Sequence, residues 1–341
     1  MDHKNDILKK CNSCYFAKEL NSDDIPFWSK KSENYSPYPK MISCDENYSL
    51  KNPDIREINP KLNDNSLELK LTLDTDLSNH WIYYWAAKST NDPLIINDPI
   101  TAYGKYENHG LKQINDEGIV LLKLNCPQPY NDQKQTYCRH LHYILEGPDK
   151  TWVPLKTIRI ICTIDLNELD QFIKLKNSII INALPEKYFL KEHIPNSFNL
   201  PTQSLDKLTK KSKERQILKF LKKIIPSYPK IQKLILDKKL DIKDVPIITY
   251  CAHSKCDASE QLINHLYECQ FNNVLEWKEG MKGWNTNRTF FNPKSTDDNN
   301  EKDDKDNDDN NDDEDEDDES DEDDEDDEDD EDDEDDEDDE D

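Results

Sequence analysis

The last 45 residues of the chain are almost entirely polar, and this stretch most constrains what the chain can fold into. From Asp297 to Asp341 it holds 37 Asp and Glu against two Lys, a net charge of −35. Such a run repels itself and has no apolar surface to offset the entropy lost on ordering, so we expect it to be disordered. The remaining residues, 1–296, hold 37 acidic and 42 basic residues, a net charge of +5. The overall charge of −30 is therefore the sum of the charges of a mildly basic body and a polyanionic tail.

The body is long enough for two domains and contains all six Trp and all nine Cys, so it can bury a core. It has no apolar segment of membrane-spanning length, and its start, MDHKNDILKKCNSC, lacks the apolar stretch of a signal peptide. We therefore expect no membrane association, a cytoplasmic location and reduced thiols. The abundance of Asn, Lys, Ile and Asp suggests an AT-rich genome; for a large DNA virus, packaging in the virion is an alternative.

The N-terminal half predicts a β domain behind an irregular arm. Residues 1–60 are polar, with scattered Pro, and are expected to be an arm that is partly ordered against the following residues. Residues 61–165 contain short, mostly alternating β-branched or aromatic segments separated by turn residues, which is typical of an antiparallel sandwich. These segments are SLELKLTLD, HWIYYWAA, GIVLLKLNC, RHLHYILEG and VPLKTIRIICTI.

From residue 166 to 292 the pattern becomes alternately strand and helix. The apolar runs at 178–182 and 245–251 are typical of buried parallel strands, and residues 272–277 supply a third. Between the last two, ASEQLINHLYEC places apolar side chains on one helix face. This order predicts a parallel sheet with right-handed crossovers and a site at the carboxyl ends of its strands. We expect the tail to begin at residue 293.

A basic insert occupies residues 205–243, between the first two predicted α/β strands. It holds 13 Lys or Arg and four acidic residues, with an amphipathic stripe at Ile217, Leu218, Leu221, Ile224 and Ile225 that ends at two prolines. A crossover helix with a solvated basic face is the main interpretation. A docking surface for the acidic tail or for an anionic partner is the alternative.

Cofactor and metal sites find little support in the sequence. With only six glycines, the chain has no dinucleotide fingerprint and no phosphate-cradling loop, so no cofactor is expected. Cys11 and Cys14 have metal-ligand spacing, but only Cys44 lies near them. His140 and His142 project from one strand face, with Cys126 and Cys138 in flanking segments, which leaves a transition-metal site as an alternative to simple packing. We expect no metal.

One cysteine stands at a position suited to chemistry. Cys251 closes an apolar strand and is followed by AHSKCDAS and then a helix. Its sulfur should therefore lie at the mouth of the sheet, facing backbone N–H groups near a helix N-terminus. Such surroundings stabilise an anion, lower a thiol pKa and favour a thiolate or persulfide.

The region from about residue 167 to 290 resembles the rhodanese family. Its members have a strand ending in Asp-x-Arg, then the phrase Gly-His-Ile-Pro-Gly-Ala-x-Asn-Ile-Pro, where this chain has IINALPEKYFLKEHIPNSFNLP. The later pattern of strand, active-site Cys, loop, Ser, helix and Gly-Gly-x-x-x-Trp is echoed by YCAHSKCDASEQLINHLYECQFNNVLEWKEGMKGW. The resemblance implies a rhodanese-like α/β fold for residues 166–292.

Departures from the family pattern limit which activity the resemblance implies. Asn182 and Leu184 replace the usual Asp and Arg, and Gln270 replaces a Gly, all at positions expected to hold the scaffold. The cysteine loop is two residues longer than is typical. Related phosphatases need Cys-x5-Arg for bidentate phosphoryl binding, but Asp257 stands at that sixth position, so phosphatase activity is disfavoured.

Sulfur transfer is the activity that the resemblance then implies. Cys251 would be the nucleophile and persulfide carrier, and Lys255, the cation within the loop, would steady an anionic donor. Ser259 matches the family's post-loop Ser and is expected to cap the helix. Cys256 is either a loop filler or a second thiol that resolves a persulfide or sulfenate on Cys251.

Histidines complete the candidate site. His253 either polarises a sulfur or is an exposed loop residue, whereas His193 is expected to make a structural hydrogen bond.

The predicted function is a rhodanese-type sulfurtransferase that moves sulfur from a thiosulfate-like or mercaptopyruvate-like donor to a thiol acceptor. The alternatives are a catalytically drifted, rhodanese-like protein-binding module and a thiol redox switch between Cys251 and Cys256. The tail suggests a basic protein partner and argues against nucleic acid.

Overall fold

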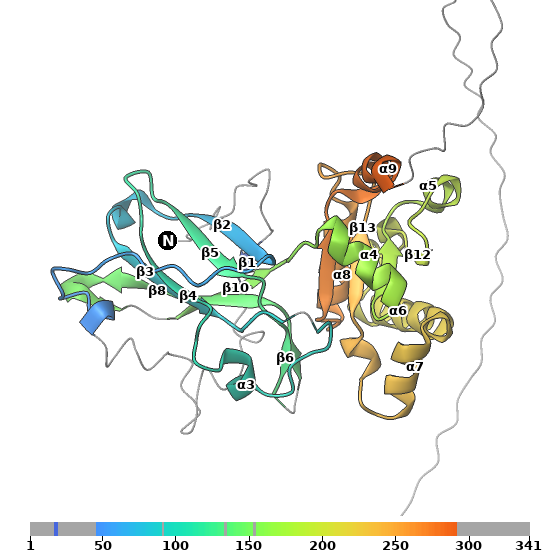
Figure 1. Ribbon diagram of the computed structural model, residues 1–341, viewed down its shortest axis with the longest axis horizontal. Coiled ribbons are helices and arrows are strands. Elements are labelled where there is room, and N and C mark those ends of the chain that lie inside the picture. The colour runs from blue at the N-terminus through green and yellow to red at the C-terminus, as the bar shows by residue number, and fades with distance from the viewer. Residues whose placement is uncertain (1–16, 20–45, 91, 133–134, 153–154, 292–341) are drawn as a thin grey trace, which may run out of the picture. The chain divides into compact units, whose positions relative to one another are not determined.

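The structure is a computed structural model that describes residues 17–19, 46–90, 92–132, 135–152 and 155–291 (Figure 1). Backbone contacts group Met1–Pro293 as one unit and Lys294–Asp341 as another, and the second unit lies outside the described residues. The predicted disordered tail, the Cys11, Cys14 and Cys44 group and most of the N-terminal arm lie outside them too. Among the described helices, none combines the length and the apolar character needed to cross a bilayer.

The N-terminal region is rich in β-strands, as predicted. Within the described residues, a six-stranded sheet has the order β1-β10-β8-β3-β4, with β9 paired to β8, and β2 pairs with β5 in a separate sheet. These pairings are antiparallel. The strands are β1 (Ala17–Glu19), β2 (Ser66–Thr72), β3 (Trp81–Ala86), β4 (His109–Gln113), β5 (Ile119–Asn125), β6 (Tyr130–Asn131), β7 (Thr136–Tyr137), β8 (His140–Gly147), β9 (Thr151–Trp152) and β10 (Lys156–Ile160).

Five of these strands were not predicted from the sequence: β1, β4 and the two-residue strands β6, β7 and β9. The short β4 follows the helix α3 (Pro99–Tyr103) and carries only one large aliphatic side chain, Leu111, so its apolar pattern is weak. The strand β1 lies inside the predicted arm and pairs with β10, with Ala17 opposite Ile160. The arm is therefore partly ordered against the β-rich region, as expected.

The α/β region contains a parallel sheet whose order, among the described strands, is β12-β11-β13-β14. Three of these strands were predicted; β12 lies within the HIPNSFNLP phrase and was not, because it is only three residues long. The bounds are α4 (Leu166–Leu175), β11 (Ile179–Asn182), α5 (Glu186–Lys191), β12 (Ser197–Asn199), α6 (Lys210–Ile224), α7 (Pro229–Leu236), β13 (Ile247–Tyr250), α8 (Ala258–Glu268), β14 (Val274–Trp277) and α9 (Gly280–Phe291).

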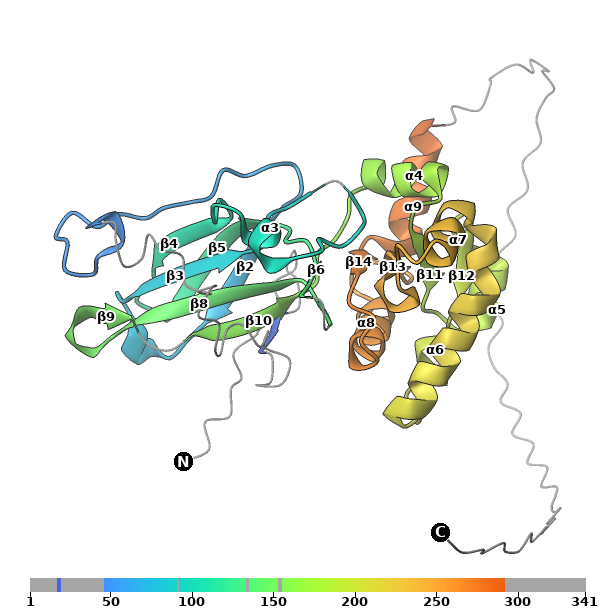
Figure 2. The ribbon, with the colours of Figure 1, turned by 90° about the horizontal axis from the view of Figure 1, so that it is seen from below.

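Helices cover both faces of this sheet (Figure 2). Alternate residues of a strand point to opposite faces, and the buried side chains divide accordingly. Ile179, Ile181 and Ile247 pack with α6, α7 and α8. Ile180 and Ile248 pack with α4 and α9 on the other face. The continuous apolar runs in the sequence are thus explained by burial on both sides.

The predicted amphipathic helix of the basic insert is α6. Its buried positions include Ile217, Leu221 and Ile224, while Leu218 is only partly buried. The helix ends before Pro226, and α7 begins at Pro229, because proline lacks the N–H that continues a helix. Lys213 departs from the solvated face: its side chain is buried and pairs with Glu268 at 2.8 Å.

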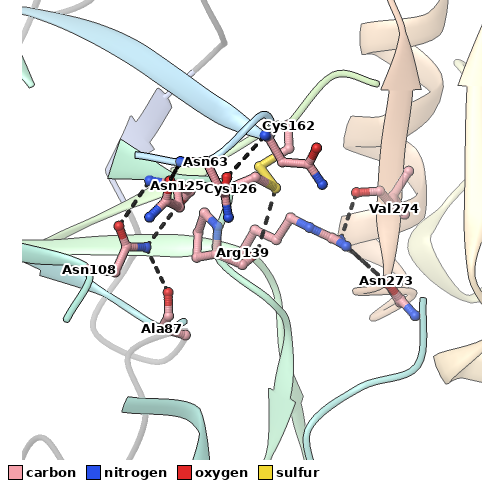
Figure 3. The surroundings of a disulfide bond; sticks show 11 residues. Asn63, Ala87, Asn108, Asn125, Cys126, Arg139, Cys162, Asn273 and Val274 are labelled. Carbon is pink, nitrogen blue, oxygen red and sulfur yellow. Dashed lines mark hydrogen bonds between the residues drawn. A yellow bond between two sulfur atoms is a disulfide. The ribbon is translucent and has the colours of Figure 1, made fainter. Parts of the chain in front are cut away.

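A disulfide joins Cys126 to Cys162, which contradicts the prediction of reduced thiols (Figure 3). Cys126 directly follows β5, and Cys162 lies two residues beyond β10. Their Cα atoms are 5.9 Å apart although 36 positions separate them in sequence. Spacing alone gave no sign of this pair, because the approach is created by strands of two separate sheets.

The segment after Cys162 connects the two regions and extends the parallel sheet. Thr163 forms a parallel bridge with Glu276 of β14. The Glu276 N–H donates to the Cys162 carbonyl at 3.0 Å, and the Ile164 N–H donates to the Glu276 carbonyl at 2.9 Å. The disulfide therefore anchors the segment that binds the edge of the α/β sheet.

Two buried arginines of the β-rich region also contact the α/β region. Arg139 donates to the Val274 carbonyl at 3.0 Å (Figure 3). Arg159 lies over the Tyr267 ring, 4.4 Å from its centroid, and donates to Asn264 Oδ1 at 2.6 Å. These contacts are made to β14, the strand that pairs with β13, and to α8, the helix that follows the cysteine loop.

Replacing both Cys126 and Cys162 with Ser should lower the free energy of unfolding by roughly 2–4 kcal/mol, because the bridge restricts the unfolded chain. Urea denaturation of the oxidised protein and of the variant would measure the difference. Cys138→Ser, at a half-buried cysteine outside the disulfide, is the matched control. Equal unfolding midpoints for the double variant and the wild type would contradict the prediction.

Candidate active site

Cys251 lies where the sequence placed it, directly after the buried strand β13 and near the start of α8. In the sheet, β13 has β11 on one side and β14 on the other. The carboxyl ends of all three strands therefore meet around this residue. Cys251 is buried, with 1% of its surface exposed.

The Cys251 sulfur is surrounded mainly by oxygen atoms. Its Sγ lies 3.3 Å from the Ser259 hydroxyl, 3.4 Å from the Cys256 carbonyl and 3.9 Å from the His253 carbonyl. Carbonyl oxygens accept but cannot donate, so they favour a protonated thiol. The Ser259 N–H also faces the sulfur and acts in the opposite direction.

The two cysteines of the loop differ in acidity, in the opposite sense to the prediction. The hydrogen bond with the Cys256 side chain and burial raise the pKa of Cys251. The same hydrogen bond lowers the pKa of Cys256, and N–H groups of Ala252 and Ala258 add to this effect. The prediction of a lowered pKa for Cys251 is wrong because Cys251 shares a hydrogen bond with the Cys256 side chain and is buried, whereas the two N–H groups face the second, more exposed sulfur.

Ser259 does not cap α8, contrary to prediction. It lies in the first turn of the helix, is completely buried and donates its hydroxyl hydrogen to Glu276 Oε1 at 2.6 Å. Glu276, on β14, has 3% of its surface exposed, and burial raises its pKa. Lys278 Nζ lies 3.4 Å from the same Oε1 atom and 3.8 Å from Glu260.

The other predicted site residues lie at the periphery. Lys255 and His253 are exposed, and the Lys255 backbone N–H lies 3.3 Å from His253 Nδ1. His193 makes the structural hydrogen bond that was predicted: its Nδ1 lies 2.9 Å from the Phe189 carbonyl, and its ring stacks on Phe189.

The scaffold departures have local explanations. Asn182 is buried and accepts from the Leu184 N–H at 2.8 Å, which holds the turn after β11. Gln270 has a φ of 66°, in the left-handed region that glycine adopts most readily. Both positions hold the backbone, as expected.

The sequence missed Glu276 and Lys278. They lie 25 and 27 positions after Cys251, and only the parallel pairing of β13 with β14 brings them close to the cysteine loop. One signal was present: a Glu inside the otherwise apolar strand VLEW needs a buried polar partner.

The residues of the metal alternative at His140 and His142 have other partners. Cys126 is in the disulfide, and both imidazole Nε2 atoms contact the Tyr103 hydroxyl, at 3.0 and 2.9 Å. Within the part of the chain that the structure describes, no group of three or more His, Cys, Asp or Glu side chains is arranged to hold a metal ion.

Gly280 attaches the cysteine loop to α9. It has a φ of 58°, and a Cβ atom there would lie 2.5 Å from the Cys251 carbonyl oxygen. The next two N–H groups, of Met281 and Lys282, donate to the Cys251 and Ala252 carbonyls at 3.0 and 2.9 Å. Glycine is therefore required at the first position of GMKGW both by conformation and by close backbone approach.

A family comparison identifies the α/β region. The rhodanese-like domain model matches residues 165–287. These residues are therefore a rhodanese-like domain, placed in the C-terminal half of the chain as predicted.

Solved structures with a similar chain trace include a human single-domain sulfurtransferase, TSTD1, at 12% identity and a TM-score of 0.25, covering 36% of this chain and 95% of that one. The N-terminal domain of a putative ATP/GTP binding protein from Clostridium difficile 630 has 19% identity and a TM-score of 0.22, covering 37% and 98%. These scores are too low to add to the family match. No curated protein matches the sequence significantly.

Gly280→Ala should destabilise the protein and increase the reactivity of Cys251. A left-handed alanine costs about 1–3 kcal/mol, and here its Cβ would also displace the loop backbone. Gly104→Ala is the matched control, because Gly104 has a φ of 50° but a Cβ there would lie 3.9 Å from its nearest neighbour. Thermal unfolding and the rate of Cys251 alkylation would test this; equal effects of the two variants would contradict it.

Proposed function

We propose that the protein is a sulfurtransferase that carries sulfur as a persulfide on Cys251. The observation that carries the proposal is the position of Cys251 in a rhodanese-like domain, buried at the carboxyl end of a central strand beside the N-terminus of α8. This place can hold a reactive sulfur apart from bulk solvent. The donor would be thiosulfate-like or mercaptopyruvate-like, and the acceptor a thiol.

The chemistry proceeds through the thiolate of Cys251. The thiolate attacks the outer sulfur of a thiosulfate-like donor, a Cys251–sulfur bond forms, and the donor's S–S bond breaks as sulfite leaves with its electron pair. An acceptor thiolate then attacks the outer sulfur of the persulfide and releases the Cys251 thiolate. Lys255, exposed on the loop, is the proposed contact for the anionic donor.

A thiol redox switch is the second candidate, favoured by the hydrogen bond between the two cysteine side chains. Peroxide would oxidise the Cys256 thiolate to a sulfenate. Cys251 would then attack that sulfur to form the disulfide, and hydroxide would leave. This order reverses the one inferred from the sequence, because Cys256 is the more acidic and more exposed thiol.

For the remaining regions we propose the organisation predicted from the sequence. The domain limits are 61–165 and 166–292, and the first domain is a two-layer sandwich. Its support is a shared core in which Leu69 and Leu122 of the small sheet pack with Tyr84 and Leu141 of the large one. The acidic run is proposed to attract a basic protein, on the ground of its charge.

Incubation with thiosulfate or mercaptopyruvate should add the mass of one sulfur atom to the wild type and to Cys256→Ser, but not to Cys251→Ser. Intact mass measurement would show this directly. Transfer should become faster as the pH rises into the alkaline range, because the pKa of Cys251 is raised and a larger fraction of its thiolate forms there. Absence of the adduct on reduced wild type would refute sulfur transfer and favour a non-catalytic module.

Mild peroxide should link Cys251 to Cys256, as detected by peptide mapping without reduction. Cys251→Ser should instead leave an oxidised Cys256 that a sulfenate-specific probe labels. If the linked peptide does not form in the wild type, the redox candidate fails, whatever the result with sulfur donors.

A further inference from the structure

We propose that Glu276 is the proton acceptor for the Cys251 thiol and acts through the Ser259 hydroxyl. The inference rests on the proposed function, because it explains how the sulfur that carries the persulfide becomes a nucleophile. Glu276 does not touch the reacting sulfur, so it is a positioning residue that acts through Ser259.

The three side chains form a continuous chain of polar atoms. Cys251 Sγ lies 3.3 Å from Ser259 Oγ, and Ser259 Oγ lies 2.6 Å from Glu276 Oε1. All three residues are at least 97% buried. Within such a shielded path, a proton can pass between the end groups without entering bulk water.

The chemistry of the groups fixes the direction of the hydrogen bonds. An ionised carboxylate only accepts, so the single hydroxyl hydrogen of Ser259 points to Glu276. The Ser259 oxygen is then left to accept from the Cys251 thiol. When the thiol hydrogen turns from Cys256 to Ser259, the arrangement runs from thiol to hydroxyl to carboxylate, and this is the state that removal of the Cys256 thiol isolates.

Activation of Cys251 shifts two protons by one step each. Ser259 Oγ receives the thiol proton and passes its own hydrogen to Glu276 Oε1. The S–H bond breaks with its electron pair left on sulfur, the carboxyl O–H bond forms, and the hydroxyl is regenerated. Nothing is oxidised or reduced, and the proton held on Glu276 returns to a sulfur later in the cycle.

Glu276 is held in place by backbone contacts from outside its own strand. Its N–H and carbonyl bind Cys162 and Ile164 of the connecting segment. A surface carboxylate would move freely, whereas this one is fixed toward the first turn of α8.

Several other ionisable groups face this path. Lys278 contacts Glu276, and Glu260 of α8 contacts Lys278, at 3.4 and 3.8 Å respectively. Cys256 shares a hydrogen bond with Cys251, and the charge of His253 acts on Cys256. Glu260 is the control residue for Glu276. Its carboxylate also lies beside Lys278, but the Ser259 hydroxyl donates its hydrogen to Glu276.

The experiment measures the pH dependence of Cys251 alkylation by iodoacetamide in the full-length protein, with the modified peptide identified by mass. Cys256→Ser provides the background, since it removes the second thiol from the shared titration. In this background the alkylation rate should become independent of pH toward acidic pH. The thiol proton moves to Glu276 and not to solvent, so the fraction of Cys251 thiolate does not change with pH in that range.

Adding Glu276→Gln should remove this level region, so that the rate falls about tenfold for each unit of pH, as for a single isolated thiol. Gln retains an acceptor for Ser259, which preserves the fold, and thermal unfolding would check this. Ser259→Ala, which breaks the chain but leaves the Glu276 charge, should give the same steep profile. Glu260→Gln should keep the level region.

An unchanged profile in Glu276→Gln would overturn the proposal. Loss of the level region in Glu260→Gln as well would also overturn it, because the effect would then come from charge in general. The measurement uses no sulfur donor. A Glu276-dependent profile without a sulfur adduct would therefore refute the proposed function alone, and an adduct with an unaffected profile would refute the proton path alone.

Discussion

A buried carboxylate needs polar partners inside the protein, and this requirement governs the position of Glu276, which has 3% of its surface exposed. Its side chain accepts from Ser259 of α8 and lies beside Lys278, while its backbone binds the segment 162–164. One residue thus joins the sheet, the helix that follows the cysteine loop and the connection to the β-rich region. The position of Ser259 next to Cys251 follows from these contacts.

The β-rich region is therefore a structural part of the candidate site. The Cys126–Cys162 disulfide fixes the segment that binds Glu276, and Arg139 binds the start of β14. On the opposite side, α9 binds the cysteine loop through the N–H groups of Met281 and Lys282. The loop and its neighbouring strand are thus held from two directions, which favours a fixed geometry around the sulfur.

Local sequence pattern predicted most elements near the site. The apolar runs of β11 and β13 and the periodic face of α8 are each encoded within a few residues, so they were found. The strand β4 was missed because Leu111 is its one large aliphatic side chain, and β12 was missed because three residues carry little pattern. The disulfide and the Ser259–Glu276 hydrogen bond were missed because their partners are distant in sequence and meet only through strand pairing.

The sequence by itself determined the rhodanese-like character of the C-terminal half and the position of Cys251 after a buried strand, since both depend on local order along the chain. Only the tertiary structure decided which cysteine is the more acidic and which carboxylate stands behind the serine. Acidity depends on burial and on the direction of nearby N–H and C=O groups. These directions are set by the folding of the loop against α9 and β14, and no spacing of residues specifies them.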